Sequence, residues 1–218
     1  LYASSDCNIV LQPSEKGLDS LAVGSPRVHR YTDEASAEYV LWYHGRSNDD
    51  DMDLPPLSTG RIGRATSRNG LVWERSGKSA SEDDGVVGHN TESWWGFDTA
   101  HVGLGTVLLP VSTPAVLTEG GVYLLYYFGG NYEETPLQDY LVPTLPESKQ
   151  NSTCIGMQMK IGVAVSQDGI TWGRVEGDDP SGAVVVPYRK DNPNTDPSLE
   201  LPEELYCAWP EVMVDTTK

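Results

Sequence analysis

One stretch of the sequence occurs twice, and this repetition constrains the fold more than any other feature. The first copy covers residues 60–73 and the second covers residues 160–172. Six residues of the first copy are identical to the residue 99 positions later. Ile62, Gly63, Ala65, Ser67, Gly70 and Trp73 recur as Ile161, Gly162, Ala164, Ser166, Gly169 and Trp172. A chain that repeats itself in this way is expected to use one structural unit more than once.

Each copy predicts a β-hairpin that ends in a tryptophan. Asn69-Gly70 and Asp168-Gly169 are residue pairs that favour the positive φ angles of a two-residue type I′ turn. Because side chains alternate along a strand, Gly63, Ala65 and Ser67 share one face. A face of small residues predicts that another sheet layer passes close over it.

The elements around the hairpins also repeat in order. An opening strand is expected at residues 25–31 and again at 111–117, and a strand with apolar residues on both faces at 38–45 and again at 121–129. The apolar strands share the pattern Tyr-x-Leu-x-Tyr-x-Gly. A third opening strand is expected at residues 208–214. No window carries the spacing of an amphipathic helix.

Recurring four-stranded antiparallel units, each buried on both faces, indicate an all-β fold and favour a β-propeller with long inter-strand loops. The main alternative is a β-sandwich, which would not require the same strand order to repeat. We predict one propeller domain over residues 1–218, with repeat units at about 25–75 and 111–175 and a third begun at 207–215. Two full units cannot close a ring, and the sequence begins at Leu1, so we expect a mature product or part of a longer protein.

The charge of the chain argues against some classes of partner. It has 15 Lys+Arg against 32 Asp+Glu, a net charge of -17. Nucleic acids and anionic membranes favour positive surfaces, so we expect neither as a partner. No run of 18 apolar residues predicts a membrane span.

Metal, cysteine and glycosylation signals are weak. The acidic clusters lack EF-hand spacing, and His44 and His89 lack metal-ligand spacing, so we expect no metal site and no cofactor other than, at most, structural calcium. Three cysteines define no disulfide framework. The acceptor sequence at residues 151–153 suggests a location outside the cytoplasm, either secreted or in an organelle lumen.

The two units resemble the five-bladed β-propeller glycoside hydrolases and transferases, the group that holds arabinanases, levansucrases and invertases. The resemblance rests on residues 39–45 and 60–73 and on their copies at 123–129 and 161–172. Residues 166–172 also look like the Asp-box of six-bladed sialidases, but one residue is missing between Asp and Gly. The resemblance implies five blades and a pair of carboxylates on the innermost strands, where one gives a proton to the leaving oxygen and the other attacks or activates water.

The opening strand of each unit should be the innermost, which directs the search for catalytic acids. Glu211 follows Trp209-Pro210 and is predicted to be the general acid, with a pKa raised by desolvation beside the tryptophan. Asp98 is predicted to be the second carboxylate or a substrate ligand. Aromatic and basic side chains nearby are the candidates for substrate binding: Trp94, Trp95, His101, Arg27 and Trp209.

Each of these residues also has a purely structural interpretation. Glu211 is then a strand-end acid beside a packed tryptophan, and Trp94 and Trp95 cap the core beneath a long loop. The first two predicted opening strands contain no acid, which departs from the hydrolase pattern. Two functions therefore stay open. The first is a carbohydrate-active propeller that hydrolyses or transfers glycosyl groups of an oligosaccharide or glycoside by paired carboxylates. The alternative is a catalytically inactive propeller that binds carbohydrate or serves as a scaffolding subunit for other proteins.

Overall fold

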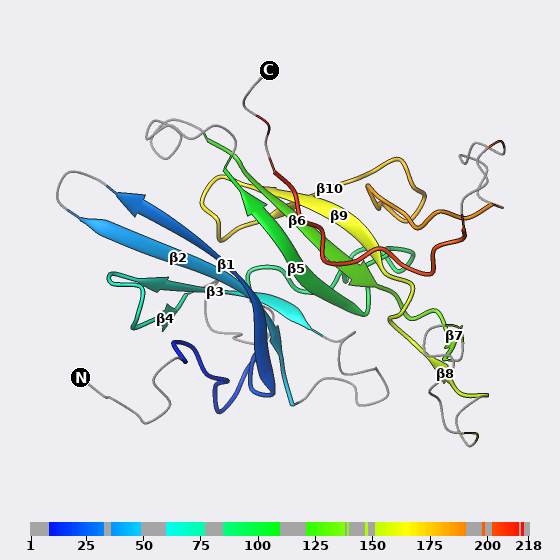
Figure 1. Cartoon of the computed structure of the whole chain (residues 1–218), viewed down its shortest axis with the longest axis horizontal. Helices are drawn as coiled ribbons and strands as arrows, with labels where there is room; N and C mark the ends of the chain where they lie inside the picture. Colours follow the sequence, from blue (N-terminus) through cyan, green and yellow to red (C-terminus); the bar gives the residue numbers. More distant parts are fainter. Residues whose placement is uncertain are drawn as a thin grey trace.

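The computed structural model describes residues 9–32, 36–48, 60–76, 85–109, 121–137, 139, 147, 151–190, 198, 202–213 and 215. These residues form two four-stranded antiparallel sheets and one two-stranded sheet (Figure 1). In this part of the chain, no helix has the length and apolar character needed to cross a membrane. The all-β prediction is confirmed.

The two large sheets have the same strand order. The first contains β1 (Ala22–Thr32), β2 (Ala37–Arg46), β3 (Arg61–Ser67) and β4 (Glu74–Arg75), in that order. The second contains β5 (His101–Leu108), β6 (Tyr123–Gly130), β9 (Lys160–Ser166) and β10 (Gly173–Val175), in that order. The small sheet pairs β7 (Thr135–Pro136) with β8 (Thr153–Cys154). The described residues therefore contain two four-stranded sheets whose strands follow one another in the same order along the chain.

One predicted opening strand was wrong, and another lies outside the described residues. The predicted strand at 111–117 is the one outside them, and the first strand of the second sheet is β5, which was not predicted. Gly103 and Gly105 lower the strand propensity of β5, which explains why it was missed. Residues 208–213 are not a strand: they run along β5, where Thr106 Oγ1 donates to the Pro210 carbonyl (2.8 Å).

The repeated glycines make room for tyrosine rings. Tyr43 lies directly opposite Gly63 in the ladder, and Tyr127 lies opposite Gly162. A Cβ atom would come within 2.4 Å of Tyr43 Cζ at Gly63 and within 2.7 Å of Tyr127 Cζ at Gly162. At these positions the residue is small because a ring from the adjacent strand covers it, and not only because another sheet passes over the face.

The repeated turns are not the type I′ turns that the sequence predicted. Gly70 and Gly169 have positive φ angles (74° and 69°), but Asn69 and Asp168 do not. Instead, Asn69 Oδ1 accepts hydrogen bonds from the backbone N–H groups of residues 71 and 72, and Asp168 Oδ1 does the same for residues 170 and 171, at 2.7–2.9 Å. The serine two positions earlier accepts from the glycine N–H in both turns. A side chain thus takes the place of a tight backbone turn.

The two large sheets pack face to face, and their inner faces are different. Val40, Trp42 and Ile62 of the first sheet share one core cluster with residues of the second sheet that include Tyr123 and Leu125. Trp42 Nε1 also donates to the Gly169 carbonyl across the interface (3.0 Å). In the first sheet, Leu41, the residue equivalent to Leu125, belongs to a separate cluster on the opposite face, so the two sheets contact each other through non-equivalent faces, head to tail. This arrangement favours propeller blades over a sandwich of two matching faces.

The ring-over-glycine packing predicts which strand glycines can be replaced. For Gly162→Ala, a Cβ would lie 2.5 Å from Phe97 Cζ and close to Tyr127, so we expect the free energy of unfolding to fall by about 1–3 kcal/mol. Gly173→Ala is the matched control, because no atom lies within 4 Å of its Cβ position. Chemical denaturation measures both variants. Equal effects of the two substitutions would contradict the packing argument.

Candidate functional site

The first strands of both large sheets meet the segment of residues 208–213, here called the C-terminal segment (Figure 1). Arg27 Nε of β1 donates to the Gly105 carbonyl of β5 (2.6 Å), and His29 Nε2 donates to the Val107 carbonyl (3.0 Å). Thr106 on β5 holds the C-terminal segment by donating to Pro210 and accepting from the Val212 N–H. Residues from three distant parts of the sequence therefore form one junction, which we call the strand junction.

Glu211 is the accessible carboxylate of the strand junction. Its Oε2 forms an ion pair and hydrogen bond with Arg27 Nη2. The side chain of Glu211 is 66% exposed. The sequence predicted a Glu211 side chain desolvated by Trp209, and the structure does not show this burial. The geometry offers a charged carboxylate, oriented by a guanidinium and in contact with solvent.

Trp209 stands two residues before Glu211 in the chain and has a constrained backbone conformation. Its φ angle of 50° is unusual for a residue other than glycine and costs about 1–3 kcal/mol. Its ring packs against Phe128, with centroids 4.9 Å apart, and still leaves exposed surface. Gly105 permits the close approach of the neighbouring Pro210, because a Cβ there would lie 2.4 Å from Pro210 Cγ. The contact with Phe128 holds the indole, and the close packing of Pro210 on Gly105 fixes the backbone next to it.

Asp98 lies in a different environment from Glu211. It is 1% exposed, accepts a hydrogen bond from the Tyr127 hydroxyl (2.9 Å) and forms an ion pair with Arg174 Nε (2.7 Å). Burial, together with the adjacent Asp98 charge, raises the pKa of Tyr127. The carboxylate of Asp98 is therefore engaged by two partners inside the protein.

The same arrangement occurs in the first sheet. Asp19 is 2% exposed, accepts a hydrogen bond from the Tyr43 hydroxyl (2.9 Å) and pairs with Arg75 Nε (2.8 Å). We call the two sets the Asp–Tyr–Arg triads. Since the Asp98 triad has a counterpart in the other repeat, its geometry is explained by the fold.

The sequence contained a signal for the triads that the analysis missed. An arginine stands two positions after each repeated tryptophan, as Arg75 and Arg174, and each triad tyrosine stands two positions before a glycine. The triads are hard to align because their members recur at different offsets. The arginines are 99 residues apart (174 − 75), the tyrosines 84 (127 − 43) and the aspartates 79 (98 − 19). Loops of different length separate the members.

His101, a predicted substrate ligand, is fully buried at the start of β5. Its Nε2 donates to the Gly156 carbonyl (2.7 Å), and its ring lies against Phe128. Burial lowers its pKa to about 4. In this position the imidazole is neutral at physiological pH and is enclosed within the protein.

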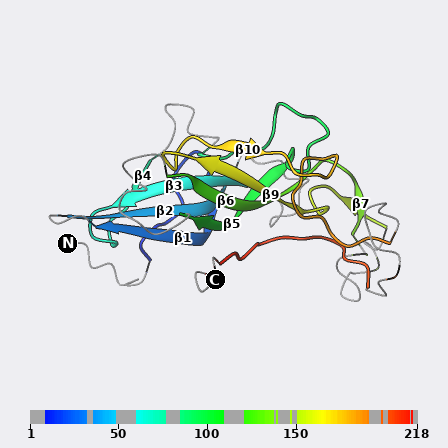
Figure 2. The ribbon, with the colours of Figure 1, turned by 90° about the horizontal axis from the view of Figure 1, so that it is seen from above.

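Trp94 and Trp95 lie away from the strand junction. Their loop (residues 89–97) precedes β5, and the two side chains are 87% and 55% exposed. Figure 2 shows this loop (green) on the opposite side of the second sheet from the C-terminal segment (red). Of the predicted site residues, Arg27 and Glu211 are in contact and Trp209 stands two residues before Glu211, while Asp98, His101, Trp94 and Trp95 lie elsewhere. The predicted roles of all of them stay predictions.

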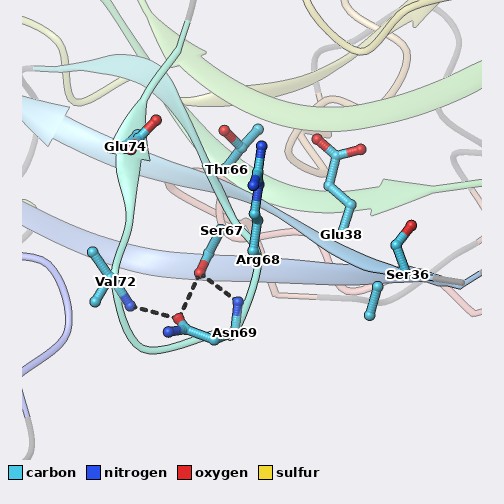
Figure 3. A pocket seen from close by; sticks show the side chains of 9 residues that line it. Ser36, Glu38, Thr66, Ser67, Arg68, Asn69, Val72 and Glu74 are labelled. Atoms are coloured by element: carbon cyan, nitrogen blue, oxygen red, sulfur yellow. Dashed lines mark hydrogen bonds between the residues drawn. The ribbon is translucent and has the colours of Figure 1, made fainter.

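An open hollow of about 730 Å³ borders the turn of the first sheet and is lined by Glu38, Arg68 and Glu74, among others (Figure 3). A hollow of about 480 Å³ borders the equivalent turn of the second sheet, where Val122 and Gln167 replace Glu38 and Arg68. Both follow from the repeated turn, and their linings differ in charge. The hollows are therefore features of the repeat, and neither contains a residue predicted for the site.

No metal site is formed by the described residues. Among them, no three or more His, Cys, Asp or Glu side chains are grouped to hold an ion. The acidic clusters at 49–51 and 82–84 lie outside the described residues, as does Cys7, while Cys154 and Cys207 are free thiols.

Comparison of folds identifies similar solved structures. A putative glycosidase from Bacteroides thetaiotaomicron is 17% identical, with a TM-score of 0.50 over 82% of this chain and 43% of that protein. A glycosyl hydrolase from Bacteroides ovatus is also 17% identical, with a TM-score of 0.48 over 82% of this chain and 42% of that protein. No protein-family model and no curated protein matches the sequence at a significant level.

At this level of identity the comparison concerns the fold alone. The chain shares its fold with the Bacteroides thetaiotaomicron protein, which confirms the resemblance to glycoside hydrolase-like propellers as a likeness of structure. The chain spans less than half of the length of these proteins.

The equivalence of the two triads predicts equal effects of two substitutions. Asp98→Asn and Asp19→Asn each leave an arginine without its charge partner. We expect each to lower the free energy of unfolding by about 2–3 kcal/mol, less than for a fully buried pair because the Arg174 and Arg75 side chains are 33% and 39% exposed. Urea denaturation measures both. An Asp98→Asn protein that is as stable as the wild type but has lost sugar binding or turnover would restore Asp98 as a site residue.

Burial of His101 predicts a pH dependence of stability. Its pKa is about 4 in the folded chain and about 6.5 in the unfolded chain, so the unfolded chain binds the proton more tightly. The contribution of the neutral His101 to the free energy of unfolding is complete above pH 6.5 and is lost as the pH falls toward 4. We expect wild type to lose about 2 kcal/mol more than His101→Gln between pH 7 and pH 5. Burial also lowers the pKa of His29, so the wild type should lose stability relative to His29→Gln in the same direction over this pH range. Identical pH profiles of wild type and His101→Gln would contradict the assignment.

Proposed function

We propose that the chain forms part of a five-bladed, carbohydrate-active propeller in which Glu211 contributes one carboxylate to glycosyl hydrolysis or transfer. The observation that carries the proposal is the setting of Glu211 at the strand junction. There the carboxylate is exposed to solvent and paired with Arg27, and it follows by two residues Trp209, whose ring packs on Phe128 and keeps exposed surface. The head-to-tail stacking of the sheets and the fold shared with a putative glycosidase support the same proposal.

The contacts of Glu211 suggest its part in the chemistry. Glycosyl hydrolysis uses one carboxyl group to protonate the leaving oxygen and a second, charged one to attack the sugar or activate water. Because Glu211 Oε2 accepts a hydrogen bond from Arg27 and the side chain is open to solvent, we assign it the attacking or water-activating role in place of the proton-donor role that the sequence suggested. Trp209 offers an apolar face on which a sugar ring of an oligosaccharide or glycoside would stack.

Two observations favour a second candidate, a catalytically inactive propeller that binds carbohydrate or acts as a scaffold for other proteins. Neither β1 nor β5 contains an acidic residue. Asp98, the proposed second carboxylate, is engaged by Tyr127 and Arg174. Such a protein would use Arg27 and Trp209 to hold a sugar without needing the acid chemistry of Glu211.

A location outside the cytoplasm also remains our proposal. Asn151, the acceptor residue of the glycosylation sequence, is exposed on a turn before β8. An accessible acceptor supports a secreted or lumenal protein. Mass spectrometry of the protein isolated from its natural source would detect a glycan there.

Turnover measurements distinguish the two candidates. We expect the protein to cleave or transfer at least one member of a panel of oligosaccharides and fructosides, and Glu211→Gln to reduce the rate about 10²–10⁴-fold. Glu176→Gln, which changes an exposed carboxylate at the far edge of the second sheet, is the matched control. Chromatography of the products measures the turnover of both variants and of the wild type.

The possible results separate clearly. Unchanged turnover in Glu211→Gln would remove this residue from the mechanism. Absence of any product from folded wild-type protein that still binds sugar would favour the inactive propeller.

A further inference from the structure

The pair of exposed tryptophans lies on the far side of the second sheet from Glu211. Glu211 lies at the edge formed by β5, whereas the tryptophan loop is bonded to the other edge. Arg174 Nη2 of β10 donates to the Gly88 carbonyl (2.7 Å), and the Phe97 N–H donates to the Ser181 carbonyl beyond β10 (3.2 Å). Three strand spacings separate β5 from β10, about 14 Å in all. The separation is visible in Figure 2.

The loop that carries the tryptophans is internally bonded. Asn90 Oδ1 accepts hydrogen bonds from the backbone N–H groups of Glu92 (3.0 Å) and Ser93 (3.2 Å), and the Asn90 N–H donates to the Asp98 carbonyl (2.8 Å). At the end of the loop, the buried ring of Phe97 stacks on Tyr127 with centroids 5.7 Å apart. The exposed tryptophans thus belong to a loop whose conformation is fixed by its own hydrogen bonds and by the packing of Phe97.

The two indoles form an angular surface. The rings of Trp94 and Trp95 are 5.9 Å apart and nearly perpendicular, at 88°. Large apolar side chains gathered on a surface generally mark a binding site. Each indole offers at most about 250 Å², whereas a stable protein–protein interface buries at least about 1,200 Å². The area of the tryptophan pair therefore suits the apolar face of a small ligand and is too small for a stable protein–protein interface.

The polar surroundings specify the chemistry of that ligand. Glu92 and Ser93 precede the two tryptophans directly in the same loop, and their carboxylate and hydroxyl groups are hydrogen-bonding groups of the kind that sugar hydroxyls need. The net charge of -17 disfavours an anionic ligand. An apolar face edged with hydroxyl groups, on a neutral molecule, is the surface of a neutral sugar ring.

We infer that Trp94 and Trp95 form a second carbohydrate-binding site, separate from the strand junction, that stacks on a neutral sugar unit of a polysaccharide. The inference rests on the proposed carbohydrate function and specifies its substrate class as a polymer. One polymer chain would contact the tryptophan pair on one side of the second sheet while another part of it reaches Glu211.

Affinity electrophoresis tests the inference with arabinan, levan and mannan as the polymers in the gel. We expect at least one polymer to retard the wild-type protein and Trp94→Ala and Trp95→Ala each to weaken that retardation at least tenfold. Glu211→Gln and Trp209→Ala should keep most of it, because they change the other site. Leu71→Ala removes a comparably exposed apolar side chain from the turn between β3 and β4 of the first sheet and serves as the control. Denaturation midpoints establish that every variant is folded.

Each other outcome overturns the inference. Retardation that survives in Trp94→Ala and Trp95→Ala, or that is lost only in Trp209→Ala, would leave the strand junction as the binding site. Absence of retardation by all three polymers would reject the second site. Association of wild type with another protein that Trp94→Ala abolishes, without any sugar effect, would make the pair a protein contact. Turnover of short oligosaccharides tests Glu211 separately, so a failure of the second site can be told from a failure of the proposed function.

Discussion

The buried Asp–Tyr–Arg triads are the contacts on which each sheet depends. Each joins the segment before a sheet to its second and fourth strands, elements that no backbone ladder connects. Gly45 and Gly129 leave the space into which the aspartates fit, since a Cβ there would lie within 3.0 Å of Asp19 Cβ or 2.5 Å of Asp98 Cβ. A buried carboxylate is stable only with its partners in place. The glycine that makes room for each aspartate, the tyrosine and the arginine are therefore all needed for the same buried contact.

Head-to-tail stacking gives the two sheets unequal environments. The face of the first sheet that bears Trp42 is covered by the second sheet, while its other face packs against residues such as Leu11 and Leu18. A contact between two different faces can be repeated by further copies, until a ring closes. The interface between the sheets thus explains in physical terms why a unit repeated in sequence is suited to a propeller.

The sequence predicted the elements of the repeat well and their surroundings poorly. Period-2 patterns and matched glycines located β2, β3, β6 and β9, because local preference and burial agree there. β5 was missed because its glycines serve contacts made by distant residues, Phe128 at Gly103 and Pro210 at Gly105. The turns were misassigned because a side chain replaces the backbone in closing them.

Asp98 and Glu211 illustrate why a site is harder to predict than a fold. Both are acids near tryptophans in the sequence, and nothing local distinguishes them. Only the tertiary structure shows that one is enclosed with Tyr127 and Arg174 and the other is open to solvent. The separation of Trp94 from Trp209 across a sheet is equally a property of the folded chain.

The two hydrogen bonds of Arg27 have a consequence for how the protein responds to a ligand. The same guanidinium joins β1 to β5 and holds Glu211, so the seam between the sheets and the exposed carboxylate share one group. A ligand that binds the guanidinium or the carboxylate and displaces Arg27 changes the free energy of the contact between the sheets. By thermodynamic linkage, the stability of that contact changes the affinity for the ligand by the same amount. Occupancy of the strand junction and cohesion of the fold are therefore coupled through a single side chain.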